Sequence, residues 1–189
     1  MTDSAKLLKA LEFASHRHRA QKRKGTKNIP FINHPIQVAN LLANDGGESD
    51  PVLLTAAILH DVIEDTVNSV EERSMLMQEI REVFGNEVLV LTMEVTDDKT
   101  LEKKVRKQLQ VEHANHKSSN ARKLKIADKI TNLRDIIDDP PGWWSTERIL
   151  EYITWAEQVF EGLKGVNPVL EEMFREVAAA ARIKYQNNS

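Results

Sequence analysis

Residues 50–65 read DPVLLTAAILHDVIED and place a strongly apolar run directly before a cluster of ionisable side chains. Asp50 followed by Pro51 is typical of a helix N-cap with proline at the first helical position. The apolar residues that follow predict a helix that is buried along most of its length. The chain must fold around such a helix, and the ionisable side chains at its far end need partners wherever they are shielded from water.

Continued as one helix through residue 65, this segment would carry four ionisable side chains on one face of about 140°. They are His60, Asp61, Glu64 and Asp65. Acidic groups this close repel one another unless a positive charge lies among them, and a divalent cation is the usual solution. The alternative is an exposed acidic face with a single histidine, and these residues alone favour that alternative.

Helical spacing of apolar residues recurs along the rest of the chain. The segments with this pattern lie near residues 7–15, 36–42, 70–83, 86–95, 99–115, 119–137, 145–163 and 167–185. No Asn-Gly or Asp-Gly hairpin signal lies between alternating apolar runs. We therefore expect an all-α protein, a compact multi-helix bundle that forms a single domain over residues 1–189 and includes a C-terminal helical extension from about residue 145.

Charge and composition exclude several classes of function. The chain has 26 basic and 29 acidic residues and a formal net charge of −3, so no overall field favours nucleic acid or an acidic membrane. It has no cysteine, which excludes disulfides, thiolate nucleophiles and cysteine-ligated zinc. No apolar run approaches the roughly 20 residues needed to span a bilayer. We expect a cytoplasmic protein that binds neither polymeric nucleic acid nor membrane, and its oligomeric state stays open.

Two residues far away in the sequence change the interpretation of the acidic face. His34 directly precedes Pro35, which marks a helix start, and a histidine held there can reach inward. Asp128 lies on the apolar face of a helix, where an unpaired carboxylate is costly, so it needs a metal ion or a cationic partner. Lys125 and Lys129 could supply that cation in an ordinary buried ion pair.

Two imidazoles and two carboxylates then form one set with room for water. Its members are His34, His60, Asp61 and Asp128. This mixture of nitrogen and oxygen ligands suits Mn²⁺, Fe²⁺ or Zn²⁺ better than Ca²⁺. The sequence therefore predicts a transition-metal site.

The order of these residues resembles the H...HD...D arrangement of the HD-domain metal-dependent phosphohydrolases. The segments HRAQKRKGTKNIPFINHP, AAILHDVIEDT, EVTDDKT and KIADKITNLRD are similar to the hydrolase domain of the RelA/SpoT alarmone enzymes. Within that family the similarity is greatest to the stand-alone small alarmone hydrolases, which include the metazoan SpoT homologue. It continues through PPGWWSTERILEYITWAEQVFEGL and covers about residues 5–173. The resemblance implies an HD-domain fold.

The resemblance also implies roles for individual residues. One Mn²⁺ ion would be bound by His34, His60, Asp61 and Asp128. Glu64 and Asp65 would orient and deprotonate an attacking water molecule. The implied substrate is guanosine 3′,5′-bis(diphosphate), (p)ppGpp, from which water releases pyrophosphate at the 3′ position to leave GDP or GTP. The chemistry is consistent, because a cation lowers the pKa of its bound water and a neighbouring carboxylate accepts the proton.

The basic segment QKRKGTK offers charge for a phosphorylated substrate, although such a run is also typical of a solvated loop. The resemblance implies that Arg23 and Lys24 face the nucleotide and that Asn132 contacts its sugar or base. Asn132 lies one helical turn beyond the last of the candidate metal ligands, on the same face. Lys103 and Arg148 are lesser candidates for phosphate contact, since either is more typical of surface charge.

Two other functions stay open. One is an HD phosphohydrolase that acts on another small nucleotide, such as NADPH or a nucleoside monophosphate. The other is a catalytically silent helical binding module, against which the intact Glu64 and Asp65 argue. Two departures from the family pattern bear on substrate choice and on the edge of the fold: Phe31 stands where tyrosine is common, and residues 66–85 form a longer segment than in the metazoan form.

Overall fold

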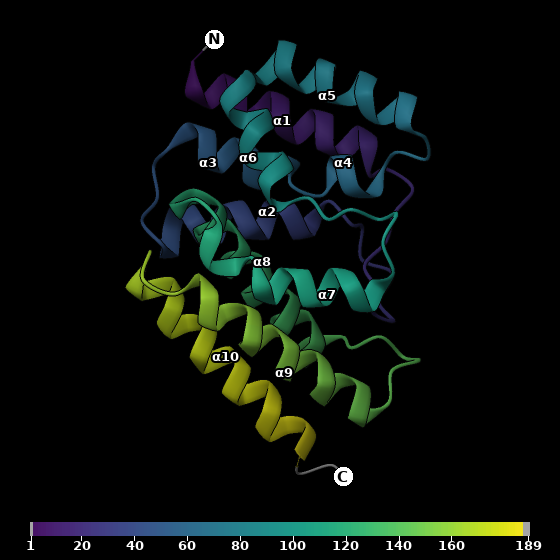
Figure 1. Ribbon diagram of the computed structural model, residues 1–189, viewed down its shortest axis with the longest axis vertical. Coiled ribbons are helices and arrows are strands. Elements are labelled where there is room, and N and C mark those ends of the chain that lie inside the picture. The colour runs from purple at the N-terminus through teal and green to yellow at the C-terminus, as the bar shows by residue number, and fades with distance from the viewer. Residues whose placement is uncertain (1, 187–189) are drawn as a thin grey trace.

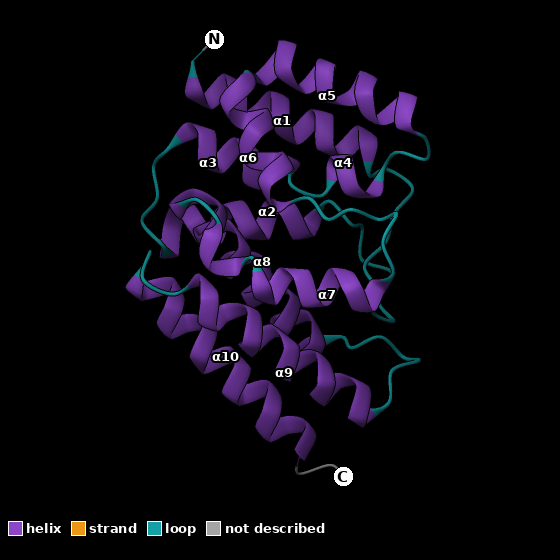
Figure 2. Ribbon diagram, viewed as in Figure 1, coloured by secondary structure: helices purple, strands orange, loops and turns teal. Residues whose placement is uncertain are grey.

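The computed structural model describes residues 2–186, and most of them lie in helices (Figure 2). In chain order the elements are α1 (Asp3–Arg17), α2 (Asn33–Asn40), a π-helical turn (Leu41–Asp45), α3 (Pro51–Leu59), α4 (Val62–Asp65), α5 (Val70–Phe84), α6 (Asn86–Val95), α7 (Lys103–Glu112), a 3₁₀ turn (Ala114–His116), α8 (Ser119–Asp138), α9 (Thr146–Leu163) and α10 (Pro168–Gln186). No strand occurs in residues 2–186, where the one isolated β-bridge joins Lys22 and Pro30. The predicted all-α class is confirmed.

Helix α8 is the central element of the fold. It packs against α2, α3, α6, α9 and α10. In the view of Figure 1, α1, α3, α5 and α6 lie above it, and α9 and α10 lie below it. A helix that is contacted from several sides must bury polar residues as well as apolar ones. Those that α8 buries are Lys125, Asp128, Lys129 and Thr131.

Helix α3 is apolar on all sides and starts as the sequence predicts. Asp50 is its N-cap and accepts a hydrogen bond from the Val52 amide at 2.9 Å, with Pro51 in the first turn. Six of its nine residues are buried, so the helix lies inside the fold. Among residues 2–186 no helix is long and apolar enough to cross a membrane.

The prediction that this helix continues to residue 65 is wrong. Helix α3 ends at Leu59, and the short helix α4 starts at Val62 after a turn formed by His60 and Asp61. The His60 Nδ1 lies 2.7 Å from the Ala57 carbonyl oxygen, which would accept the Asp61 amide in a continuous helix. The imidazole thus competes for a backbone acceptor, which explains the break.

The predicted helix over residues 99–115 is also shorter in the structure. It begins only at Lys103, because the Asp98 carboxylate forms a tight turn with Thr100, accepting its amide at 3.0 Å and its hydroxyl at 2.7 Å. This turn leaves residues 96–102 as a loop between α6 and α7.

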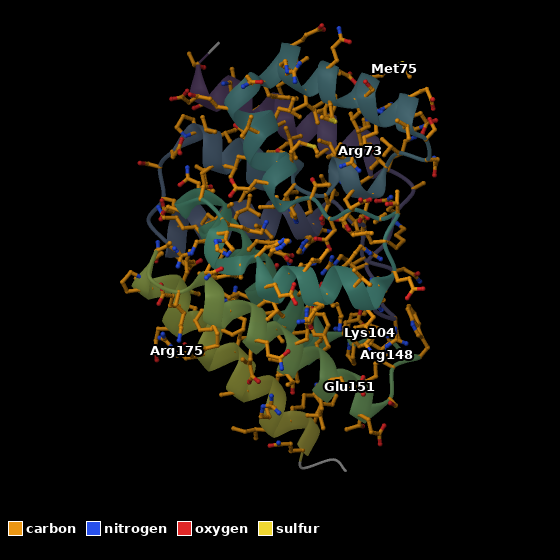
Figure 3. The ribbon with its side chains drawn as sticks, viewed as in Figure 1. Arg73, Met75, Lys104, Arg148, Glu151 and Arg175 are labelled. Atoms are coloured by element: carbon orange, nitrogen blue, oxygen red, sulfur yellow. The ribbon has the colours of Figure 1, made fainter. Side chains whose placement is uncertain are left out.

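Residues 66–85, which we expect to be longer than in the metazoan form, carry α5 on the outside of the fold. Ser69 caps this helix by accepting the Glu72 amide at 3.1 Å. Its inner face packs on α6 and buries Phe84, whose ring meets Phe13 of α1 edge-on at 5.5 Å between centroids. Met75 points into solvent from the outer face (Figure 3). The segment therefore adds an outer helix that packs on α6 and not on the central helix α8.

The start of α10 is capped by its own residue Glu171. The Oε1 atom of Glu171 accepts hydrogen bonds from the amides of Gly165 at 2.7 Å, Val166 at 3.0 Å and Asn167 at 3.3 Å. Burial favours the neutral acid, but these three amides lower the pKa of Glu171 below its usual value. Gly165 has a φ of 91°, which favours glycine at this turn. The cap stabilises the connection that returns the chain to α8.

We expect Glu171→Gln to reduce the free energy of unfolding by about 1–3 kcal/mol at pH 7, because one amide oxygen replaces a charged acceptor of three bonds. A lowered folded-state pKa contributes stability above the unfolded-state pKa of about 4.3, and this contribution is lost as the pH falls through the folded value. The difference between wild type and variant should therefore stay nearly constant from pH 7 to about pH 4.3 and shrink below it, so urea denaturation should give a smaller difference at pH 3 than at pH 7. Glu172→Gln, at an exposed neighbour, is the control and should change stability little. An equal loss at both pH values would contradict this account.

Candidate functional site

Four side chains from three parts of the chain meet at the centre of the fold. The Nε2 atom of His34, on α2, lies 3.2 Å from Asp128 Oδ1, on α8, and 3.6 Å from Asp61 Oδ2. The Nε2 atom of His60 lies 3.1 Å from the same Asp61 oxygen. One ligand atom each from His34, His60 and Asp128 lie within 4.8 Å of one another, as a metal site requires. The structure thus brings together the four residues that the sequence singled out.

Hydrogen bonds orient both histidines toward this point. Nδ1 of His60 donates to the Ala57 carbonyl at 2.7 Å, so Nε2 is the ring nitrogen that faces the carboxylates. The Thr131 hydroxyl donates to the Asp128 carbonyl at 2.9 Å, so it can accept from His34 Nδ1 at 3.3 Å. His60 Nε2 is buried beside the Asp61 carboxylate. A divalent cation fits this position, because it would take the place of the Nε2 proton next to the carboxylates.

The charges of the group are strongly coupled. Burial favours neutral acids here, yet the Lys129 ammonium, 3.1 Å away, and the two histidines hold the pKa of Asp128 well below its usual range. Burial also opposes the charged form of His60, but Asp61 raises its pKa to about 9. Burial lowers the pKa of His34 despite the neighbouring Asp128. The carboxylates are therefore charged at neutral pH, and their negative charge favours a bound cation at this site.

The two lysines proposed as partners of Asp128 differ in the structure. Lys129 is the ion-pair partner of Asp128 Oδ2. Lys125 is buried and donates to the Val95 carbonyl at 3.1 Å instead. Asn132 donates to Asp128 Oδ1 at 2.6 Å, so both oxygens of this carboxylate have polar neighbours. A buried ion pair and a metal-ligand geometry thus coexist at Asp128.

Glu64 and Asp65 lie in the short helix α4, directly after the metal-ligand candidates. Glu64 Oε2 accepts the Asp97 amide at 3.0 Å, and its Oε1 lies 3.9 Å from Arg106 Nη1. Burial raises the pKa of Glu64, the Asp97 amide opposes this, and the nearby Asp61 charge adds to it. Asp65 instead forms an ion pair with Lys99. The two acids therefore have different environments, and the raised pKa of Glu64 is of the kind that suits a proton acceptor near neutral pH.

Residues without a predicted role hold these two acids in place. Asp97 and Lys99 lie in the loop between α6 and α7, and Gln21 donates to the Asp65 carbonyl at 2.7 Å. The loop belongs to the EVTDDKT segment, whose similarity to the family already marked it as important. Its contacts with Glu64 and Asp65 depend on the packing of the loop against α4, which the sequence alone does not specify.

Arg23 and Asn132 extend the network away from the candidate metal ligands. Arg23 Nη2 donates to Asn132 Oδ1 at 2.7 Å, and its Nε donates to Asp135 at 2.7 Å. The guanidinium carbon of Arg23 also lies 5.4 Å from the centroid of the Phe31 ring. Asn132 therefore joins Arg23 to Asp128, and Arg23 is held rigidly beside the candidate metal ligands.

The other three cations predicted to contact phosphate share one region of the surface; they are Lys24, Lys103 and Arg148. Lys103 is exposed, yet partial desolvation of its ammonium and the charges of Arg148, Lys24 and Arg106 lower its pKa. Arg148 stacks on Trp144 at 4.8 Å and lies on the same side of the molecule as Lys104 (Figure 3). Clustered cations that repel one another form a ready site for a polyanion.

Comparisons with known proteins agree with this arrangement. A family model described as HD domain matches residues 10–148. The chain is 46% identical to mouse (Mus musculus) guanosine-3′,5′-bis(diphosphate) 3′-pyrophosphohydrolase MESH1 over 176 residues, which cover 93% of this chain and 94% of that protein. It is 47% identical to the human (Homo sapiens) protein of the same name over 174 residues, which cover 92% and 93% of the two chains.

Solved structures support the same relationship. A structure titled as a metazoan ortholog of SpoT that hydrolyzes ppGpp superposes with a TM-score of 0.86 at 40% sequence identity, covering 93% of this chain and 95% of that one. The predicted similarity to the metazoan SpoT homologue is confirmed. The chain therefore belongs to the HD-domain family, as the order of its histidines and aspartates predicted.

Proposed function

We propose that this protein is a Mn²⁺-dependent (p)ppGpp 3′-pyrophosphohydrolase that yields GDP or GTP and pyrophosphate. The observation that carries the proposal is the buried group of His34, His60 and Asp128, with Asp61 beside it and Glu64 in the next helix. Its similarity to relatives named for this activity supports the choice of substrate.

We propose that a single HD-type domain spans residues 1–189, including the extension from about residue 145. The close packing of α10 on α8, and of α9 on both α7 and α8, supports this interpretation. The small net charge favours a small nucleotide partner over polymeric nucleic acid or membrane, in a cytoplasmic setting.

The metal ion would be held by His34, His60, Asp61 and Asp128. Two imidazole nitrogens and two carboxylates suit Mn²⁺, and Fe²⁺ or Zn²⁺ would also fit this donor set. When bound, such an ion lowers the pKa of water and polarises a phosphoryl oxygen. The site would favour such an ion, because two charged carboxylates lie there and the ion can replace the buried proton of His60 Nε2.

The protein side chains then handle the proton and the substrate. Glu64, oriented by the Asp97 amide, takes a proton from the water whose oxygen attacks the phosphorus attached to O3′. The bond between that phosphorus and O3′ breaks, and the ribose oxygen gains a proton. Asp65, held by its ion pair with Lys99, would help to orient the water.

Substrate charge would be met by the basic residues around the site. Arg23 and Asn132 form one unit beside the candidate metal ligands, which suits contact with the ribose and the 3′ group. Lys24, Lys103 and Arg148 would meet the remaining phosphates, because their charges act on one another across one region.

Purified protein with Mn²⁺ is expected to release pyrophosphate from ppGpp, and chelation of the metal should abolish the release until Mn²⁺ is restored. Side-by-side assays with ppGpp, NADPH and nucleoside monophosphates measure the substrate choice. If the protein hydrolyses NADPH and not ppGpp, the proposed substrate is wrong. If it hydrolyses none of these nucleotides, the result favours a catalytically silent binding module.

Asp61→Asn is expected to weaken Mn²⁺ binding by at least about 10- to 100-fold, because the loss of a ligand should cost no less than the loss of an outer-shell partner. Isothermal titration with Mn²⁺ measures the affinity, and circular dichroism checks that the helices remain. Asp45→Asn, at an exposed aspartate, is the matched control. Unchanged Mn²⁺ affinity in Asp61→Asn would remove Asp61 from the ligand set.

Glu64→Gln is expected to lower kcat by about 10²- to 10⁴-fold, because the amide cannot accept the water proton. Mn²⁺ affinity should stay within a few-fold of wild type, since Glu64 is not among the candidate ligands. Steady-state kinetics and metal titration on the same preparation separate the two effects. Glu12→Gln on the exposed face of α1 serves as control. Loss of Mn²⁺ binding in Glu64→Gln would contradict the assigned role.

A further inference from the structure

The segment between α1 and α2 forms a small hairpin that carries two of the candidate substrate cations. The Arg23 amide donates to the Ile29 carbonyl at 2.9 Å, and the Phe31 amide donates to the Gln21 carbonyl at 3.0 Å. These bonds pair the two arms of the hairpin, with Arg23 and Lys24 on the first arm. In Figure 1 this loop and the loop after α8 lie on the same side of the molecule.

The two cations are held very differently. The Arg23 guanidinium is fixed by Asp135 and Asn132 of α8. Lys24 has an exposed side chain, and no ion pair to it occurs within residues 2–186. Its position therefore depends on the backbone of the hairpin tip that follows it.

The tip is held by Asp139, at the C-terminal end of α8. Asp139 Oδ1 accepts the Thr26 amide at 2.9 Å and the Thr26 hydroxyl at 2.8 Å, and Oδ2 accepts the Lys27 amide at 3.1 Å. The Lys27 ammonium donates to the Asp138 carbonyl at 3.1 Å. A carboxylate at a helix C-terminus is unfavourable, because it faces the negative end of the helix dipole. The hydrogen bonds from the hairpin amides offset this cost and explain why Asp139 lies there.

Gly25 completes the contact. A Cβ atom at this position would lie 2.0 Å from Asp139 Oδ2 and 2.5 Å from the Asp139 carbonyl oxygen. Only glycine allows the backbone directly after Lys24 to approach the carboxylate this closely. Three consecutive residues, 25–27, are therefore fitted to a single side chain that lies more than a hundred positions later.

We propose that Asp139 is a positioning residue that fixes the hairpin tip and so presents Lys24 to the phosphorylated substrate. The inference rests on the proposed function for the identity of the substrate. Its physical basis is preorganisation: a tip that is already ordered does not lose conformational freedom when the nucleotide binds. Asp139 itself contacts the hairpin and takes no part in the proton transfer.

The test compares Asp139→Ala with wild type in steady-state ppGpp hydrolysis. We expect KM to rise by about 3- to 10-fold, the factor expected when a few residues must be ordered on binding, with kcat changed less than 2-fold. The KM of Asp139→Asn should lie between those of wild type and Asp139→Ala, because the amide keeps one acceptor oxygen. Hydrogen exchange at the Thr26 and Lys27 amides should accelerate in Asp139→Ala and report the loss of the contact directly.

A double-mutant cycle links the effect to Lys24. If Asp139 acts by placing Lys24, then Asp139→Ala should raise KM little further in a Lys24→Ala background. Gly25→Ala reaches the same contact from the hairpin side and covers the case in which Asp139→Ala folds poorly. Asp138→Ala removes the neighbouring exposed carboxylate and keeps the backbone contact to Lys27, so KM should stay at the wild-type value.

The substrate that the wild-type protein hydrolyses tests the proposed function, and the KM values of the variants test the role of Asp139. Turnover of ppGpp by wild type with an unchanged KM in both Asp139→Ala and Gly25→Ala would overturn the role of Asp139 alone. Additive effects of Asp139→Ala and Lys24→Ala would overturn the link to Lys24. Turnover of a different nucleotide by wild type would overturn the proposed substrate, and the same KM comparison with that nucleotide would then decide the role of Asp139. Wild-type protein that hydrolyses none of the nucleotides would overturn both.

Discussion

The buried carboxylate of Asp128 is the constraint on which the central architecture depends. It lies on α8, the helix that neighbours contact from several sides, and its charge must be compensated there because a lone buried charge costs several kcal/mol. Lys129, Asn132 and His34 supply that compensation. The register between α2 and α8 is therefore set by a polar contact as well as by apolar packing.

The same demand for positive charge makes the centre suited to a divalent cation. The proton on His60 and the ammonium of Lys129 balance the carboxylates. A bound cation would take the place of the His60 proton, so the fold itself supplies the electrostatic environment that such an ion favours. The contacts that stabilise the centre would thus also favour a bound divalent cation.

The interruption between α3 and α4 places the members of the acidic cluster in different environments. A continuous helix would spread His60, Asp61 and Glu64 along one surface. The turn instead directs His60 and Asp61 toward His34, while Glu64 meets the loop at Asp97. The network then passes from Asp128 through Asn132 to Arg23, so the proposed metal and substrate contacts share one rigid support.

Most of the helices could be predicted from the sequence, because caps and apolar periodicity are local signals. The predicted segments 70–83, 86–95 and 145–163 differ from α5, α6 and α9 by no more than one residue at either end. The two predictions that were wrong, a continuous helix to residue 65 and a helix from residue 99, failed where His60 and Asp98 compete for backbone hydrogen bonds.

The sequence by itself determined the helical class, the need of Asp128 for a partner and the residues that the family resemblance marks as a site. Only the tertiary structure decided that Lys129 pairs with Asp128 while Lys125 binds the Val95 carbonyl, since Lys125 lies one turn earlier on α8 and meets the end of α6 there. It also decided the contact between Asp139 and the hairpin at Thr26, 113 positions apart. Local patterns encode helices and caps, whereas contacts across such distances exist only after the helices have packed.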